Sequence, residues 1–128
     1  MEHIEIVQGY LFGDVKFLDF LVVLIFLDIF FGVIKAWKKK KLRSRTAWFG
    51  YVRKIGVFGI IIAANIIDTI LGLNGTVAFG TVLFYIGNEI LSITENCAEL
   101  GIKIPSIVTD KLQVIQKEDK EKKGDKNE

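Results

Sequence analysis

Large apolar residues are concentrated in two long stretches of the chain. The first stretch, residues 17–34, has 15 large apolar side chains among its 18 residues. As a helix it would be about 27 Å long, close to the roughly 30 Å hydrocarbon core of a bilayer. The unbroken apolar run from Phe20 to Leu27 leaves no polar face for water. The pattern therefore predicts a membrane-spanning helix over residues 17–34.

The second apolar stretch, residues 55–93, is too long for one span and has a suitable length for two. Gly72, Asn74 and Gly75 interrupt it, and these residue types tolerate positive φ and commonly end helices. We therefore predict a tight helical hairpin, with its turn at these three residues.

The remainder of the chain is much more polar. Val108, Leu112 and Ile115 recur at i, i+4 and i+7, which predicts a short amphipathic helix at the inner leaflet. The last twelve residues have mixed charge and no apolar side chain, so we expect them to be disordered. The predicted fold class is an all-α integral membrane protein: three transmembrane helices, a short cytoplasmic amphipathic helix and a disordered charged tail.

Charge predicts the topology of these spans. Residues 35–54 contain nine basic residues and no acid, although the net charge of the whole chain is only +2. Cytoplasmic loops retain Lys and Arg, so we place this loop inside, the amino terminus outside and the carboxyl terminus inside. The predicted regions are an external segment (1–16), three spans (17–34, 55–72 and 76–93), a basic cytoplasmic loop (35–54), a cytoplasmic helical region (94–116) and the tail (117–128).

Basic side chains beside a span are also expected to contact anionic lipid. The residues to which we assign topology and lipid contact are Lys35, Lys38, Lys39, Lys40, Lys41, Arg43, Arg45, Arg53 and Lys54.

Composition excludes several functional classes. Cys97 and His3 are the single cysteine and histidine, so an internal disulfide and a Cys/His zinc site are excluded. A hydrolase triad would have to use His3 at the amino terminus, so we predict no enzyme, no catalytic residue, no cofactor and no metal site. Four consecutive lysines lie between two spans and indicate topology rather than nucleic-acid binding.

Polar residues also occur inside the spans. At 100° per residue, one stripe of the helix beginning at residue 76 carries Thr81, Tyr85, Asn88, Ser92, Glu95 and Glu99. Lipid cannot satisfy these groups. The stripe therefore faces water or other copies of the chain, or else it packs against the first two spans of a monomeric bundle, and the residues alone favour neither arrangement.

The other two spans repeat this feature. Asn65 and Asp68 share one face of the second span, and Asp28 shares a face with Gly32 and Lys35 in the first. The three intramembrane acids are Asp28, Asp68 and Glu89. Each is interpreted as a hydrogen-bonded structural group, a counter-ion or part of a water-filled lumen.

Three motifs resemble the bacteriophage holin family that includes toxin-secretion and phage-lysis holins of Gram-positive bacteria. The resemblance extends roughly from residue 27 to residue 115. The first motif has Asp28, Gly32, Lys35 and Ala36; the second has Gly50, Arg53 and Lys54; the third has Asn88, Glu89, Ser92, Glu95, Asn96, Gly101 and Pro105.

The resemblance implies a phage or prophage protein that accumulates in the bacterial cytoplasmic membrane and then oligomerises into lesions. These lesions would let an endolysin, or in some relatives a toxin, reach the wall, and no direct contact with the chain would be required. The implied partners are therefore further copies of the chain and membrane lipids. The predicted pore or helix-contact residues are Asp28, Gly32, Asn65, Asp68, Thr81, Tyr85, Asn88, Glu89, Ser92, Glu95 and Asn96.

Our hypothesis is that Asn88, Ser92 and Glu95 line or gate an aqueous space, supported by Asp68 and Asn65. Two other functions remain open at this point. A small ion-coupled exporter would use an intramembrane carboxylate to carry a proton. An antiholin or scaffold would oligomerise without opening.

Overall fold

The computed structural model describes residues 2–13, 15–39 and 45–127, with the backbone alone described at 45–48 and 118–127. The helices of this described part are α1 (Glu2–Phe12), α2 (Leu18–Lys38), α3 (Arg45–Leu71), α4 (Thr76–Glu99) and α5 (Ser106–Asn127). Helices α2, α3 and α4 lie alongside one another, and each is long and apolar enough to cross a membrane. The described part is thus helical and has three candidate spans, as the hydropathy pattern predicts.

A compact apolar core holds the three long helices together. Its members recur every three or four residues along each helix, so they form one inward-facing stripe per helix. Leu21, Ile61 and Val82 are the largest fully buried side chains, one from each helix. The core cluster consists of Leu18, Leu21, Ile25, Val57, Ile61, Val82 and Ile86.

The predicted hairpin turn between α3 and α4 is confirmed. Gly72, Asn74 and Gly75 have φ values of 64°, 54° and 84°, in the left-handed region that glycine and asparagine tolerate best. Helix α4 ends at Glu99, and Gly101 follows with φ of 84°. Both turns therefore have the backbone conformation that their residue types favour.

The connection between α2 and α3 is shorter than predicted. Helix α2 extends to Lys38 and α3 begins at Arg45, so most of the expected loop is helical. Hydropathy shows where the apolar side chains end, but a helix can continue beyond that point. Lys, Arg and Ala are good helix formers, so the helical backbone extends into the basic segment. As a consequence, Lys54 lies inside α3.

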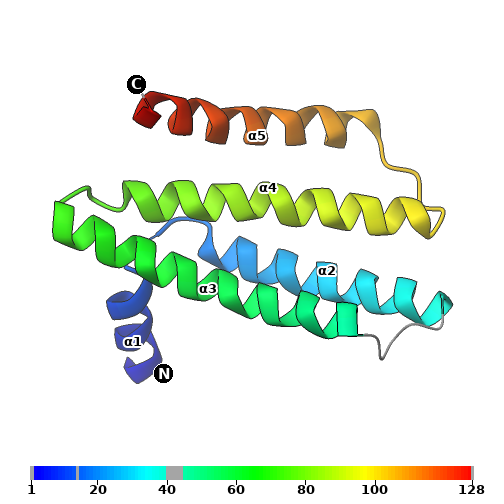
Figure 1. Ribbon diagram of the computed structural model, residues 1–128, viewed down its shortest axis with the longest axis horizontal. Coiled ribbons are helices and arrows are strands. Elements are labelled where there is room, and N and C mark those ends of the chain that lie inside the picture. The colour runs from blue at the N-terminus through cyan, green and yellow to red at the C-terminus, as the bar shows by residue number, and fades with distance from the viewer. Residues whose placement is uncertain (1, 14, 40–44, 128) are drawn as a thin grey trace.

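Helix α5 also differs from our expectation of a short helix on the inner leaflet. It continues to Asn127 and runs back along α4 (Figure 1). Leu112 is buried in this contact, and a Cβ built on Gly87 of α4 would lie 3.4 Å from Cγ of Gln116. The absence of a side chain at Gly87 therefore permits close packing, while the many Lys and Glu residues of the tail favour a helix over disorder.

Candidate functional site

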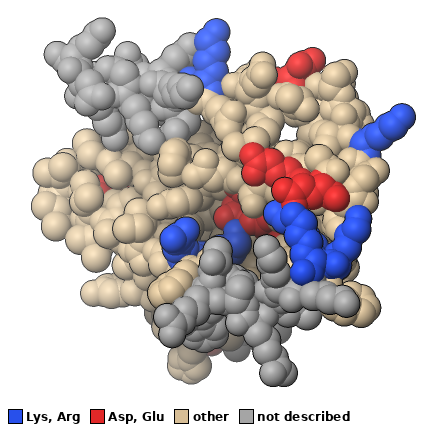
Figure 2. Space-filling view, turned by 45° about the vertical axis from the view of Figure 1, so that its right-hand side comes forward, with Lys and Arg blue, Asp and Glu red and all other residues tan. Residues whose placement is uncertain are grey.

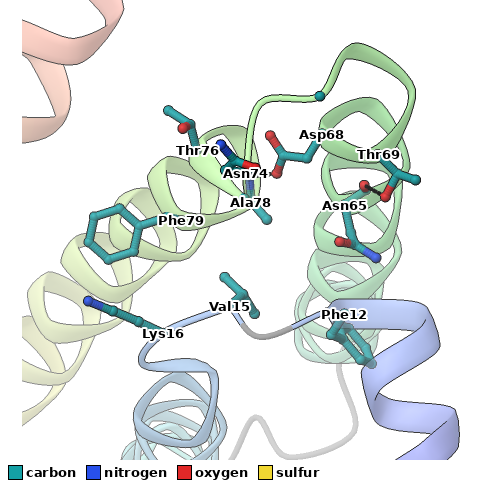
Figure 3. A pocket seen from close by; sticks show the side chains of 12 residues that line it. Phe12, Val15, Lys16, Asn65, Asp68, Thr69, Asn74, Thr76, Ala78 and Phe79 are labelled. Carbon is teal, nitrogen blue, oxygen red and sulfur yellow. Dashed lines mark hydrogen bonds between the residues drawn. The ribbon is translucent and has the colours of Figure 1, made fainter.

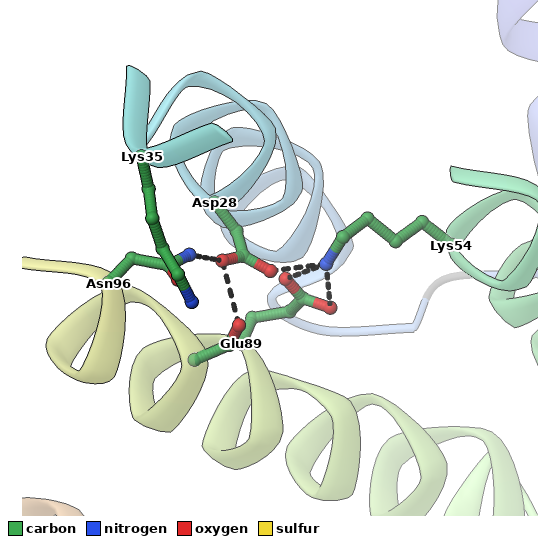
Figure 4. A network of polar contacts seen from close by, with 6 residues as sticks. Asp28, Lys35, Lys54, Glu89 and Asn96 are labelled. Carbon is green, nitrogen blue, oxygen red and sulfur yellow. Dashed lines mark hydrogen bonds and ion pairs between the residues drawn. The ribbon is translucent and has the colours of Figure 1, made fainter. Parts of the chain in front are cut away.

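A network of charged side chains lies between α2, α3 and α4 (Figure 4). Asp28 and Glu89 are 2% and 6% exposed. Asp28 follows Leu21 and Ile25 at helical spacing, so the same stripe that builds the core directs its carboxylate inward. The network is therefore enclosed by the apolar core of the bundle.

Lys54 supplies the cation at the centre of this network. Its Nζ donates hydrogen bonds to Oε1 and Oε2 of Glu89 at 3.1 and 2.9 Å, and it also pairs with Asp28. These contacts join α3 to both of its neighbours (Figure 4). One ammonium group thus links the three candidate spans.

Two polar side chains of α4 complete the surroundings of Asp28. Ser92 Oγ and Asn96 Nδ2 donate to Asp28 Oδ1 at 2.8 and 2.9 Å. Gly32 lies nearby, since a Cβ built there would be 3.9 Å from Asn96 Nδ2. Asp28 therefore accepts hydrogen bonds at both carboxylate oxygens: two from α4 side chains at Oδ1 and one from Lys54 of α3 at Oδ2.

A more exposed group of ion pairs extends the network toward one end of the bundle. Lys35 and Lys39 approach Oε2 of Glu99 at 2.9 and 3.1 Å, and Lys35 Nζ also donates to Asn96 Oδ1 at 3.4 Å. Acidic and basic side chains meet on the surface at this end in Figure 2. Because these pairs are partly solvated, each is expected to contribute little to stability.

The buried network is suited to fixing the spans relative to one another. A charged side chain in an apolar interior is stable only when it is paired and hydrogen-bonded. Among the described residues, no buried side-chain nitrogen or oxygen lacks a hydrogen-bond partner. The buried polar groups of this network therefore all take part in hydrogen bonds or ion pairs between α2, α3 and α4.

Asp68 has a separate role at the hairpin. It is 4% exposed, and its two carboxylate oxygens accept hydrogen bonds from the backbone N–H groups of Val77 and Ala78, each at 2.9 Å. These are free donors of the first turn of α4, whose own N-cap residue, Gly75, provides no side-chain cap. Asp68 of α3 thus caps α4 across the turn.

An open cavity of about 750 Å³ lies between this hairpin and the segment that follows α1 (Figure 3). Its lining combines aromatic side chains, such as Phe12 and Phe79, with the polar groups of Lys16, Asp68 and Thr76. Such a mixed lining is typical of the boundary between the apolar and aqueous parts of a membrane protein.

Comparison with known proteins identifies the family. The model of the bacteriophage holin family matches residues 6–117. A probable holin of Bacillus phage phi105 is 59% identical over 121 residues, which cover 94% of this chain and 90% of that protein. The chain belongs to the bacteriophage holin family. A phage holin is therefore the function that the comparisons support, and the family implies self-association and lysis.

Two further relatives of this holin come from bacteria. The uncharacterized protein YqxH of Bacillus subtilis is 60% identical over 96% of this chain and 88% of its own length. An uncharacterized 14.9 kDa protein in the nagH 3′ region of Clostridium perfringens is 42% identical over 74% of this chain and 73% of its own length. No solved structure matches the chain. The family and the three apolar helices support a membrane location.

The stripe predicted on α4 of the holin is divided between two environments. Ser92 bonds to Asp28, and Tyr85 is half-buried beside the core. Thr81 donates to the carbonyl of Val77 within its own helix at 2.7 Å. Asn88 and Glu95 are exposed. The stripe therefore neither packs entirely within the bundle nor lies entirely on its surface.

The basic residues of the holin do not all have the expected surroundings. The expectation of lipid contact is wrong for Lys54, because its ammonium is paired with Asp28 and Glu89 inside the bundle. Lys38 and Arg53 are exposed. Residues outside the described side chains are Lys40, Lys41, Arg43 and Arg45.

Sequence reasoning missed the role of Lys54 in this holin, although a signal was present. Lys54 precedes the core residues Val57 and Ile61 at helical spacing, so it belongs to the inward stripe of α3. Our assignment of residues 35–54 to a loop concealed this register. A basic residue in register with an apolar stripe, in a chain with intramembrane acids, indicates a buried ion pair.

Proposed function

We propose that the chain forms membrane lesions whose aqueous side is built from α4 and α5. The observation that supports this proposal is that large apolar side chains are exposed on some helices and not on others. On α4, Leu91 is the one exposed large apolar residue, at 39%. By contrast, α2 and α3 expose many of them, including Phe20, Phe26, Phe30, Ile55, Ile60, Ile66 and Ile70. Lipid therefore suits the exposed surfaces of α2 and α3 better than that of α4, while α5 exposes Ile107, Val108 and Val114 near its start.

Helix α5 supports water on the α4 side. It runs along α4, with Ile115 and Gln116 beside Gly87 in the middle of that helix. The segment from 117 to 127 is dominated by Lys, Glu and Asp. Each Lys or Asp at the centre of a bilayer costs about 2.5–3.5 kcal/mol, so this arrangement of α5 is incompatible with surrounding hydrocarbon. A shared aqueous space between copies of the chain would keep the charged side chains of α5 in water.

Asn88 and Glu95 are the α4 residues that we propose to line this space. Both are exposed, and both lie within about 100° of Gly87 around the helix axis. Ser92, Asp68 and Asn65, which we also linked to the lumen from the sequence, already make intramolecular hydrogen bonds. We propose that these three residues hold the protomer together, while Asn88 and Glu95 contact water.

The proposed orientation places the amino terminus outside and the carboxyl terminus inside. The nine basic residues between 35 and 54 support this choice, since cytoplasmic loops retain Lys and Arg. The carboxyl end of α2 and the link from α4 to α5 lie at the same end of the bundle, and the α3–α4 turn lies at the other (Figure 1). The exposed Lys38 and Arg53 are then available for anionic lipid on the cytoplasmic side.

The proposed cargo is a cell-wall-degrading endolysin, or a toxin, that crosses the lesion without a specific contact with the chain. This role requires no catalysis by the chain itself. It requires self-association, because a three-helix protomer is too small to enclose a macromolecular passage.

Coexpression with a cytoplasmic endolysin tests this function. A lesion-forming chain gives an abrupt fall in culture turbidity that depends on both proteins. If the chain instead delays lysis by another holin, it is an antiholin. Proton-coupled dye transport in vesicles without release of a macromolecule would identify an exporter, and either of these two results would overturn the proposal.

A further inference from the structure

Helix α1 has two chemically different faces, and its residues 2–10 are exposed on both of them. At 100° per residue, Ile4, Ile6, Val7 and Tyr10 fall on one side, together with His3, and Glu2, Glu5 and Gln8 fall on the other. No residue of α1 is buried, and Ile4, Ile6 and Tyr10 are 69%, 68% and 84% exposed. The apolar face of α1 therefore has no partner within the described protomer.

The carboxyl end of α1 is nevertheless held firmly by α3. Asn65 Nδ2 donates to the carbonyl oxygens of Tyr10 and Leu11 at 3.4 and 3.0 Å, which are acceptors that a helix end leaves free. Gly13 has φ of 65°, and a Cβ built there would lie 2.8 Å from Asn65 Oδ1. Glycine is thus required both for the turn and for the close approach of Asn65.

A second contact fixes the direction in which α1 leaves the bundle. The rings of Phe12 and Phe58 pack edge to face, with centroids 6.4 Å apart. In Figure 1, α1 runs across the direction of the long helices rather than along it, at the end that carries the α3–α4 turn. If the long helices cross the bilayer, α1 extends sideways from the bundle along the membrane.

The depth of the attachment matches an interfacial helix. Asn65 lies six residues before Leu71, the last residue of α3, which corresponds to about 9 Å along the helix axis. Interfacial helices bury their apolar face about 5–10 Å into the boundary between headgroups and acyl chains. The partly polar cavity of Figure 3 lies at the same end of the bundle, between the hairpin and the segment that follows α1.

We propose that α1 is an interfacial helix, with Ile4, Ile6, Val7 and Tyr10 in the lipid and Glu2 and Glu5 in water, and that Asn65 is its positioning residue. Lipid is favoured as the environment of this face because α3, to which α1 is attached, itself exposes apolar side chains at Ile66 and Ile70. The apolar face of α1 then continues a surface that already suits lipid. This inference does not depend on whether the chain forms lesions.

The test measures the depth of α1 in the full chain. Single cysteines are introduced at Ile6 and Tyr10, and separately at Glu5 and Gln8, in a Cys97→Ala background. Each is labelled with a nitroxide and reconstituted at low density in vesicles of phosphatidylethanolamine and phosphatidylglycerol. The ratio of collision rates with oxygen and with a water-soluble nickel chelate reports depth. We expect this ratio to be at least about threefold higher at positions 6 and 10 than at positions 5 and 8.

Two results would contradict the proposal that lipid covers the apolar face of α1. If all four positions favour the nickel chelate equally, α1 lies in water. If positions 6 and 10 are shielded from both reagents, and the shielding grows with protein density, a second copy covers the apolar face.

The role of Asn65 is tested with Asn65→Leu and Asn65→Asp, both of which remove the side-chain N–H donors. Each is expected to reduce, by more than half, the difference in the oxygen-to-nickel collision ratio between positions 6 and 10 and positions 5 and 8. Thr69→Val is the matched control, because the Thr69 hydroxyl donates to the backbone carbonyl of Asn65 within α3, and it should leave the contrast intact. Undiminished contrast in both Asn65 variants would contradict the positioning role. Circular dichroism identifies a variant that fails to fold. The labelled chains that retain Asn65 test the interfacial location of α1 independently of the Asn65 variants.

Discussion

Lys54 on α3 donates hydrogen bonds to both carboxylate oxygens of Glu89 on α4, at 3.1 and 2.9 Å. The same ammonium pairs with Asp28 on α2. Two acids and one base therefore share a site whose carboxylates are almost fully enclosed. Because the three residues come from three helices, the site fixes how the spans are packed, and it yields the first predictions.

Replacing Lys54 with methionine should destabilise the bundle strongly. The substitution leaves Asp28 and Glu89 as buried carboxylates without their cation, and loss of one partner from a buried ion pair costs about 3–5 kcal/mol. The free energy of unfolding in mixed detergent micelles measures the effect. Arg53→Met is the matched control, because Arg53 is exposed one residue earlier, and it should change stability by less than about 0.5 kcal/mol.

A triple variant separates the loss of charge balance from the loss of size and shape. Lys54→Met combined with Asp28→Asn and Glu89→Gln removes all three charges, and buried pairs replaced by neutral groups are often tolerated. Most of the stability lost in Lys54→Met should return. A triple variant as unstable as the single one would show that the ion pairs are not the main contribution of Lys54.

Asp28→Asn should be more damaging than Glu89→Gln. Asp28 accepts hydrogen bonds from Ser92 and Asn96 of α4 in addition to its pair with Lys54. Glu89 has Lys54 as its hydrogen-bond donor. Membrane insertion should be normal in both variants, whereas the lysis time and the unfolding free energy change more for Asp28→Asn. Equal effects would mean that the contacts to Ser92 and Asn96 contribute little.

Much of this architecture is predictable from local sequence patterns. The lengths of the apolar stretches predict the three long helices, and Gly72, Asn74 and Gly75 predict the hairpin, because hydropathy and backbone preference act over neighbouring residues. The polar stripe on α4 was also recognisable. Its division between half-buried Ser92, which bonds to Asp28, and exposed Asn88 was not, because that depends on where α2 lies in space.

The contacts between helices were much harder to predict. Asp28 and Glu89 are recognisable as intramembrane acids, but their partner Lys54 was assigned to a loop because it adjoins a basic segment. The contact of Asn65 with α1 depends on the left-handed turn at Gly13, more than fifty residues away in sequence. Such pairings follow from the tertiary arrangement and leave only weak periodic signals in one sequence.

Asp68→Ala should loosen the start of α4. It removes the acceptor for the N–H groups of Val77 and Ala78, and the loss of such a cap costs about 0.5–2 kcal/mol. Hydrogen exchange at these two amides should accelerate roughly in proportion, by about 2- to 30-fold. Asp19→Ala is the control, since Asp19 is an exposed acid in the first turn of α2. Unchanged exchange at residues 77 and 78 would contradict the capping role.

The milder substitution Asp68→Asn retains one acceptor oxygen and should change lysis timing more than membrane insertion. Its effect on hydrogen exchange should fall between those of the wild-type chain and Asp68→Ala. An insertion defect larger than the timing defect would argue that Asp68 acts before the hairpin has formed.

Gly87→Leu should displace α5 from α4. Even a Cβ at this position would lie 3.4 Å from Gln116 Cγ, so a branched side chain needs space that α5 occupies. The distance between spin labels at Leu91 on α4 and Gln113 on α5, measured by electron paramagnetic resonance, should increase and broaden. Gly80→Leu is the control, because a Cβ at Gly80 has no heavy-atom neighbour within 4 Å. An unchanged distance distribution in Gly87→Leu would show that α5 does not depend on this contact.

The most direct test of the account is the water accessibility of α4 in cells that are about to lyse. Cysteines replace Asn88 and Glu95 on the proposed aqueous side, or Phe26 and Phe30 on the lipid side, in a Cys97→Ala background. A membrane-impermeant thiol reagent is then added outside the cells. The account predicts that positions 88 and 95 become labelled when lesions form and that positions 26 and 30 do not. Labelling at 26 and 30, with 88 and 95 protected throughout lysis, would contradict it.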